Sequence, residues 1–232
     1  MTATTSSPPL EILISPSLLA ADPLNLATEV ASIAEAGADF AHVDVMDGHF
    51  VPNLTFGPPL IRALKAETNL KLDVHIMVSN PDEVAESYVR AGADMLSFHI
   101  ESAIHPVRIA QSIAELGAVP GVAINPGSSL GLIEPLLPYV GMINVMSVNP
   151  GFGGQKFLKE TCGRVRGLRE TCHNAGYENM IIEVDGGITD DTVGAVAQAG
   201  ANMFVAGTYV FSSAQRTGRV ARLREEARSS MR

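Results

Sequence analysis

The fold is decided by Ala36-Gly37-Ala38-Asp39-Phe40-Ala41-His42-Val43-Asp44-Val45, where an Ala-Gly-Ala-Asp phrase leads into a short run of mostly apolar residues. The phrase returns as Ala91-Gly92-Ala93-Asp94 and, with one change, as Ala199-Gly200-Ala201-Asn202. The first two copies lie 55 residues apart and the last two 108, close to two and four strand–helix units. The repetition therefore predicts a chain built from similar strand–helix units.

Short apolar runs alternate with longer stretches of helical periodicity along the whole chain. Several runs are almost entirely apolar, as expected for parallel strands that are buried on both faces, and parallel strands need helical crossovers. We predict a single-domain (β/α)8 TIM barrel, with an open doubly wound sheet as the structural alternative. The eight predicted strands are Ile12–Ser17, Phe40–Val45, Leu70–Val78, Met95–His99, Gly121–Asn125, Gly141–Ser147, Met180–Val184 and Met203–Ala206.

Several residues predict where the intervening helices begin and end. Asp22-Pro23 and Asn80-Pro81 each place a capping side chain before a proline, and Glu83 gives Asn80 a capping-box partner. The stretch Ala214–Arg232 carries an apolar stripe of Val220, Leu223, Ala227 and Met231, which is typical of a last barrel helix. Helix ends are predicted at Gly37, Gly92, Gly117, Gly176 and Gly200.

Length, composition and charge limit the classes of protein. A chain of 232 residues suits a compact barrel, since these typically have about 250. The net charge of −9 argues against a general nucleic-acid or membrane surface, while backbone N–H groups can still bind a small anion. Residues 1–10 lack the apolar core of a signal peptide and are predicted to form a flexible tail before a catalytic domain of residues 11–232. We predict a cytoplasmic protein in which Cys162 and Cys172 are not paired.

Polar residues gather where predicted strands end, which is the active face of such barrels. His42 and Asp44 share one strand face, His75 lies on the next strand, and Asp185 ends the seventh. A single His at a strand end is more often a hydrogen-bonded structural residue than a metal ligand. A set of buried salt bridges is the alternative explanation for the whole group. Ends rich in His and Asp on three strands instead favour one divalent ion, Zn²⁺, Fe²⁺, Mn²⁺ or Co²⁺, held by His42, Asp44, His75 and Asp185.

Glycine-rich loops follow the last three predicted strands. They are Gly151-Phe152-Gly153-Gly154, Gly186-Gly187 and Gly207-Thr208. Each loop alone is explained equally well as a tight turn. Three of them on adjacent strands favour a phosphate site, because glycines let backbone N–H groups approach a ligand closely.

Four long segments resemble the ribulose-phosphate 3-epimerase family, in order and near the family's spacing from about Ile14 to Phe211. They are His42–Thr55, Asp73–Val78, Met146–Gln155 and Glu183–Gly187. The resemblance implies a metal-dependent, reversible epimerisation at carbon 3 of D-ribulose 5-phosphate to D-xylulose 5-phosphate, in pentose phosphate metabolism. It also implies self-association, because members of the family are often dimers or hexamers.

The resemblance assigns roles to individual residues. Asp44 and Asp185 match the two acid/base carboxylates, and both also match metal ligands together with His42 and His75. Met46, Met77 and Met146 match the thioethers that line the sugar pocket. The positions that match substrate contacts are Ser17, His75, Gly151, Phe152, Gly153, Gly154, Asp185, Gly186, Gly187, Gly207 and Thr208.

Some positions depart from the family's usual pattern, and other functions compete. Tyr209 follows Thr208 where smaller residues are usual, which bears on the shape of the phosphate end. A 3-epimerase of a hexulose phosphate such as D-allulose 6-phosphate is the nearest rival, and Gly153 and Gly187 favour the pentulose. A phosphate-binding barrel lyase would need a strand-end Lys, and a non-catalytic barrel would not keep all four ligands. Asp47, His49, Asp73, His99 and Glu101 receive no assigned role.

Overall fold

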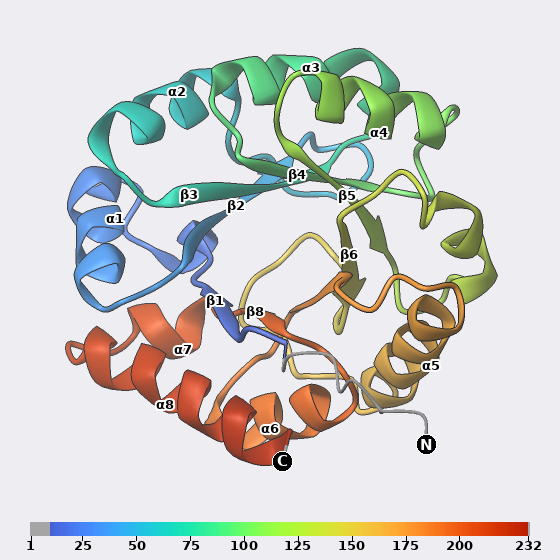
Figure 1. Cartoon of the computed structure of the whole chain (residues 1–232). Helices are drawn as coiled ribbons and strands as arrows, with labels where there is room; N and C mark the ends of the chain where they lie inside the picture. Colours follow the sequence, from blue (N-terminus) through green and yellow to red (C-terminus); the bar gives the residue numbers. More distant parts are fainter. Residues whose placement is uncertain (1–9, 232) are drawn as a thin grey trace.

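The computed structural model describes residues 10–231, and the predicted tail lies almost wholly outside them. Eight parallel strands form a ring with the helices outside it (Figure 1). The pairing runs β1-β8-β7-β6-β5-β4-β3-β2. Ser17 forms a bridge with His42, whose backbone N–H donates to the carbonyl of Pro16, so strands β1 and β2 also meet. The barrel prediction is confirmed and the open-sheet alternative is wrong.

The predicted runs and the observed strands coincide to within a few residues. The strands are β1 (Leu13–Ser15), β2 (Phe40–Met46), β3 (Lys71–Met77), β4 (Met95–His99), β5 (Val119–Ile124), β6 (Met142–Met146), β7 (Ile181–Asp185) and β8 (Met203–Val205). The α-helices are α1 (Leu26–Glu35), α2 (Pro58–Glu67), α3 (Pro81–Ala91), α4 (Pro106–Glu115), α5 (Thr161–Asn174), α6 (Asp190–Gln198), α7 (Thr208–Phe211) and α8 (Arg216–Ser230). Three short 3₁₀ helices are η1 (Leu18–Ala20), η2 (Leu130–Leu132) and η3 (Glu134–Leu136).

The predicted helix boundaries have mixed outcomes. All five predicted terminal glycines have positive φ, as expected of residues that end a helix. Pro81 begins α3, but the side chain of Asn80 bonds the Glu83 carboxylate instead of capping the helix. The predicted start at Pro23 is wrong, since α1 begins at Leu26. The Asp22 carboxylate there accepts from the backbone N–H of Leu24 at 3.0 Å and forms a turn.

The interior of the barrel changes character along the strands. Phe40, Met95, Met142 and Met203 are buried together at the end where the strands begin, and we call them the lower layer. Nearer the other end the inward-facing side chains are polar and equally buried. They include Ser15, His42, Asp73, Ser97, His99, Asn144 and Glu183.

The last helix is fastened to the segment around the first strand, beside the β1–β8 pair. Arg224 of α8 donates to the carbonyls of Ile12 and Gly37 and to the Asp39 carboxylate, which also accepts the backbone N–H of Ile14. Cys162 and Cys172 are both free, as predicted. Among the helices of residues 10–231, none has the length and apolar character needed to cross a bilayer.

Candidate metal and active site

Four buried side chains that the sequence grouped together do meet in the structure. Within the parallel pairing of β2 and β3, Asp44 lies opposite His75, and Asp185 ends β7. His42 Nε2 is 3.4 Å from Asp44 Oδ1 and 3.7 Å from Asp185 Oδ2. His75 Nδ1 is 3.6 Å and 3.4 Å from the same two oxygens. One ligand atom from each residue therefore borders a common point.

These residues fit a divalent ion. His42 Nε2 and His75 Nδ1 are buried and have no hydrogen-bond partner, which is costly for nitrogens that nothing binds. Ligand atoms about 2.0–2.2 Å from a tetrahedral ion lie roughly 3.3–3.6 Å apart, close to the separations observed. Two imidazoles and two carboxylates suit Zn²⁺ and its neighbours in the first transition row.

The His42 ring is fixed from below by a carboxylate. Its Nδ1 lies 2.6 Å from Asp73 Oδ2, and that oxygen also accepts the hydroxyl of Ser15 at 3.0 Å. Burial disfavours the charged imidazole, but the charges of Asp73 and Asp44 outweigh it and raise the pKa of His42 well above its usual value. Asp73 therefore leaves Nε2 as the His42 atom that faces the other three ligands.

The Asp44 carboxylate is held ionised. Ser17 Oγ donates to Asp44 Oδ2 at 2.5 Å. Burial alone would raise the pKa of Asp44, but the neighbouring His42 and His75 outweigh it and lower the pKa far below its usual range. The hydroxyl of Thr55 donates to the Asp44 carbonyl at 2.6 Å, which fastens the strand end to the loop after β2.

A second chain of contacts leads away from His75. Its Nε2 lies 2.9 Å from His99 Nε2, and His99 Nδ1 lies 3.0 Å from Glu101 Oε2. Burial and the nearby His75 lower the pKa of His99 to about 4, although Glu101 opposes this. Burial would raise the pKa of Glu101, but its hydrogen bonds lower it to about 2.

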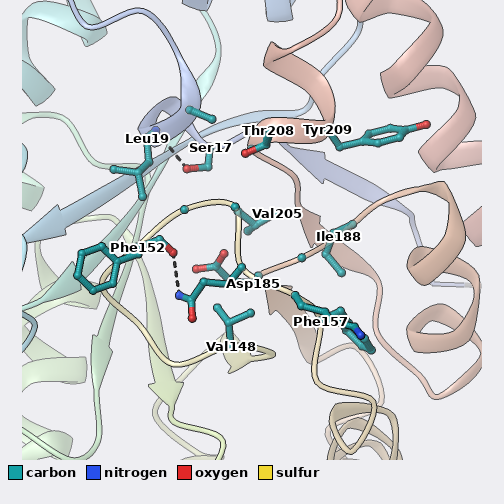
Figure 2. A pocket seen from close by; sticks show the side chains of 18 of the residues that line it. Ser17, Leu19, Val148, Phe152, Phe157, Asp185, Ile188, Val205, Thr208 and Tyr209 are labelled. Carbon is teal, nitrogen blue, oxygen red and sulfur yellow. Dashed lines mark hydrogen bonds between the residues drawn. The ribbon is translucent and has the colours of Figure 1, made fainter.

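A cavity of about 870 Å³ opens above the four candidate ligands. Asp44 and Asp185 reach its surface, while His42 and His75 lie beneath it, fully buried. Figure 2 shows Asp185 between the loop that carries Phe152 and the turn that carries Thr208. The remaining predicted contacts also line the cavity. They are Ser17, Met46, Met77, Met146, Gly151, Phe152, Gly153, Gly154, Gly186, Gly187, Gly207 and Thr208.

The loop after β7 comes so close to the loop after β6 that only glycine fits. Gly187 has φ of +63°, and a Cβ added there would lie 2.6 Å from the backbone nitrogen of Phe157. By contrast, a Cβ on Gly153 would make only an ordinary contact, 3.7 Å from Leu19. Backbone N–H groups can thus approach a ligand in the cavity without side chains between them.

Tyr209 does not close the cavity. Its side chain points away from Asp185 in Figure 2. The Arg219 guanidinium lies over its ring, 4.4 Å from the centroid, so helix α8 holds the ring. The larger residue at this position therefore borders the cavity while its ring packs against α8.

The family follows from the chain as a whole. The model of the ribulose-phosphate 3 epimerase family matches residues 13–211, which include every helix and strand of the described residues except α8.

The chain belongs to the ribulose-phosphate 3-epimerase family.

Named relatives agree with the epimerase family. Ribulose-phosphate 3-epimerase of Mycobacterium bovis is 46% identical, with 93% of each chain covered. The enzyme of Bacillus subtilis is 40% identical over 92% of this chain and 98% of that one. Ribulose-5-phosphate-3-epimerase, chloroplastic, of Arabidopsis thaliana is 45% identical over 88% and 73%. Relatives with this name are isomerases.

Solved structures show how widely the fold of this epimerase-family chain is shared. 3-Hexulose-6-phosphate synthase of Salmonella typhimurium matches with a TM-score of 0.66 at 19% identity, covering 94% of this chain and all of that one. KGPDC of Streptococcus mutans matches with a TM-score of 0.70 at 15% identity, covering 95% and 99%. At these identities the likeness concerns the barrel alone.

Sequence reasoning left some residues of this epimerase site without a role. Asp73, His99 and Glu101 contact the candidate ligands or each other, and Glu183 lies beside His42 and Asp73. Alternation along the strands already put Asp73 on the same face as His75, and Glu183 on the same face as Asp185. The register between strands decides which nitrogen each one meets, and the sequence alone does not give it. Lys156 and Lys159 also border the cavity and had no sequence signal.

Proposed function

We propose that the chain interconverts D-ribulose 5-phosphate and D-xylulose 5-phosphate, with Asp44 and Asp185 as the proton-transfer groups. One observation carries the proposal. Two carboxylates and two unpartnered imidazole nitrogens lie together at the floor of a cavity whose rim is made of glycine loops. The floor suits removal and return of a proton beside a carbonyl, and the rim suits a phosphate. The family membership supports the same substrate.

The two carboxylates differ in their surroundings, which suggests their order of action. The two imidazoles flank both carboxylates, but Asp44 in addition accepts the Ser17 hydroxyl, and this keeps it ionised at rest. It therefore takes the proton from carbon 3 in one direction of the reaction. Asp185 approaches from β7 and returns a proton to the opposite face, which inverts the centre.

The remaining residues hold the substrate and exclude water. His42, Asp44, His75 and Asp185 would hold a divalent ion, which stabilises negative charge that develops on a substrate oxygen. Met46, Met77 and Met146 give the cavity a dry, polarisable wall. Backbone N–H groups of the Gly151–Gly154, Gly186–Gly187 and Gly207–Thr208 loops bind the phosphate.

The lyase alternative finds no support in the positions of the lysines. The chain has four, and none ends a strand. Lys71 begins β3 at the opposite end of the barrel, Lys65 lies in α2, and Lys156 and Lys159 lie in the loop before α5.

On the resemblance we also propose that the enzyme works in the cytoplasm with Zn²⁺, Fe²⁺, Mn²⁺ or Co²⁺ and self-associates. Metal analysis and light scattering of the purified protein test the ion and the oligomer.

The decisive experiment compares kcat/KM for D-ribulose 5-phosphate and D-allulose 6-phosphate on one sample of known metal content. We expect the pentulose to be preferred by at least roughly tenfold, which is the discrimination that one extra carbon and hydroxyl can cause in a fitted cavity. Equal or reversed values would make the hexulose phosphate the substrate.

The same sample tests the ion. Chelation should abolish turnover, and each of Zn²⁺, Mn²⁺, Co²⁺ and Fe²⁺ should be tried for restoring it. Mg²⁺, which prefers an all-oxygen octahedral site, is the matched control and should restore little. Full activity in rigorously metal-free protein would refute the role of the ion.

A further inference from the structure

His75 differs from His42 in what lies behind it. Asp73 contacts His42 directly, whereas behind His75 a second imidazole, His99, stands between the ring and a carboxylate, Glu101. His99 is fully buried at the end of β4 and does not line the cavity. The three side chains His75, His99 and Glu101 form what we call the relay.

The contacts in the relay restrict where its protons lie. A hydrogen bond between two imidazole nitrogens contains one proton, so one of His75 Nε2 and His99 Nε2 donates and the other accepts. An ionised carboxylate only accepts, so the proton between His99 and Glu101 belongs to His99 Nδ1. In a neutral His99 ring, Nε2 then accepts, and His75 Nε2 is the donor. The proton of His75 is thereby kept away from Nδ1, the atom that faces Asp44 and Asp185.

Glu101 is anchored so that it can fix this order. Its Oε1 accepts the backbone N–H of Asn125 at 2.8 Å and the hydroxyl of Ser128 at 2.5 Å. Arg164 of α5 donates to the carbonyls of the same two residues, which holds the loop after β5 in place. One carboxylate oxygen is thus committed to the loop, and the other points at His99.

The His99 ring is also held by packing. Phe50, from the loop after β2, lies over it with ring centroids 4.7 Å apart. His75 lies on another side, with centroids 5.0 Å apart. A ring confined in this way keeps its nitrogens directed along the relay.

We propose that His99 and Glu101 are positioning residues that set the tautomer of His75 and so present its Nδ1 lone pair to the ion. The inference rests on the proposed function, because it concerns the ion-binding residues of that same site. It adds that a half-buried carboxylate two residues past the end of β4 controls metal binding without touching the ion or the substrate.

Glu101→Gln is the sharpest test, because it preserves size while making one arm of the side chain a donor. The Asn125 N–H requires an oxygen on its side, which turns the amide –NH₂ toward His99. His99 Nδ1 must then accept, its Nε2 must donate, and His75 becomes protonated at Nδ1. We expect Zn²⁺ affinity, measured by competition with a chromophoric chelator, to fall roughly 10- to 100-fold.

Glu86→Gln is the matched control. It makes the same chemical change in a carboxylate that also accepts a serine hydroxyl, but on the exposed surface of α3. Zn²⁺ affinity within about twofold of the wild type is expected there, as for surface changes in general. If Glu101→Gln also stays within twofold, the proposal is overturned.

Nitrogen-15 NMR of histidine-labelled, metal-free protein reads the tautomers directly, because no ion then fixes the proton of His75. The wild type should show His99 protonated at Nδ1 and His75 at Nε2, and Glu101→Gln should show His99 protonated at Nε2. The opposite assignment in the wild type would overturn the relay.

A pair of substitutions at His99 separates the relay from packing. Gln can accept from His75 Nε2 and should retain much of the affinity, whereas Leu fills space without accepting and should lose it. Equal affinities for the two variants would overturn the proposal. Neither readout uses substrate, so a wild type that binds Zn²⁺ but leaves D-ribulose 5-phosphate unchanged would refute the proposed function alone.

Discussion

Both ends of the barrel interior are made by the same strands, with every second side chain pointing inward, yet they are opposites in chemistry. At the lower end, Phe40 and the thioethers of the lower layer pack together with Leu13 and Ile181 at the margin. A few residues further along, buried imidazoles and carboxylates replace them. Burial of the lower layer away from water stabilises the fold. Burial of the upper groups costs them their hydration, and only hydrogen bonds and ion pairs with specific partners offset that cost. The lower layer therefore stabilises the fold, whereas the upper groups depend on the fold to hold them in position.

The largest expected difference between the two ends of the barrel comes from replacing Asp by Asn at each of them. Asp185→Asn and, separately, Asp44→Asn should each reduce kcat/KM by roughly 10³-fold or more, because an amide cannot exchange the proton. Asp94→Asn is the matched change at the lower end, where the carboxylate accepts from Lys65 and from the Leu72 N–H. It should lower the free energy of unfolding and leave kcat/KM within about threefold. Near-normal turnover in either upper variant would contradict the two-carboxylate mechanism.

A change in the lower layer should have the reverse profile. Met142→Ala removes a fully buried side chain and leaves a cavity beside Gly121. We expect the free energy of unfolding in urea to fall by about 2–5 kcal/mol. Because nothing in the cavity above touches this layer, kcat/KM should stay within about twofold in the fraction that remains folded. A large loss of activity at unchanged stability would show that the two ends are not separable.

A change between the two ends should have an intermediate effect. Asp73→Asn keeps the size of the side chain beneath His42 but removes its charge, and Zn²⁺ affinity should fall roughly 10- to 100-fold. Ser15→Ala is the control, since it removes one hydrogen bond to Asp73 and keeps the carboxylate. Competition for Zn²⁺ measures both variants, and equal affinities would mean that Asp73 acts only through packing.

The smallest expected effect is on acid stability, at a loop above the barrel. Burial would raise the pKa of Asp47, but donors from Ser79, His49 and Phe50 outweigh it and lower the pKa to about 2. Because the folded pKa lies below the unfolded value of about 4, the stabilisation is complete above pH 4 and is lost as the pH falls toward 2. The difference in unfolding free energy between wild type and Asp47→Asn should therefore shrink from pH 5 to pH 3. A constant difference in urea titrations at both pH values would exclude this charge effect.

Much of the fold and of the candidate metal site could be predicted because both depend on periodicity. Apolar runs at repeated intervals predicted the strands, and the two-residue alternation put His42 and Asp44 on one face. Barrel closure then brought His75 and Asp185 to them. The glycine loops could be predicted for a similar reason, since they follow three adjacent strands.

What could not be predicted depends on register and on competition between local hydrogen bonds. Asp73 lies opposite His42 in the β2–β3 ladder, and only that pairing identifies its role. At Asp22-Pro23 the sequence is compatible with a helix start, but the Asp22 carboxylate bonds two nearby donors and forms a turn. Such a choice between helix start and turn depends on a small difference in free energy that sequence patterns do not reveal.

The fastening of Arg224 to the first strand has a consequence for the way the protein is made. Strand β1 leaves the ribosome almost 190 residues before its partner β8, and Arg224 follows later still. Until then the nascent chain has an unpaired edge on β1 and another on its most recent strand. Such edges invite pairing with other chains, so the half-made barrel is the stage most exposed to aggregation and to chaperones. Completion of α8 ends that stage, which makes the last helix the step that commits the newly made chain to its native form.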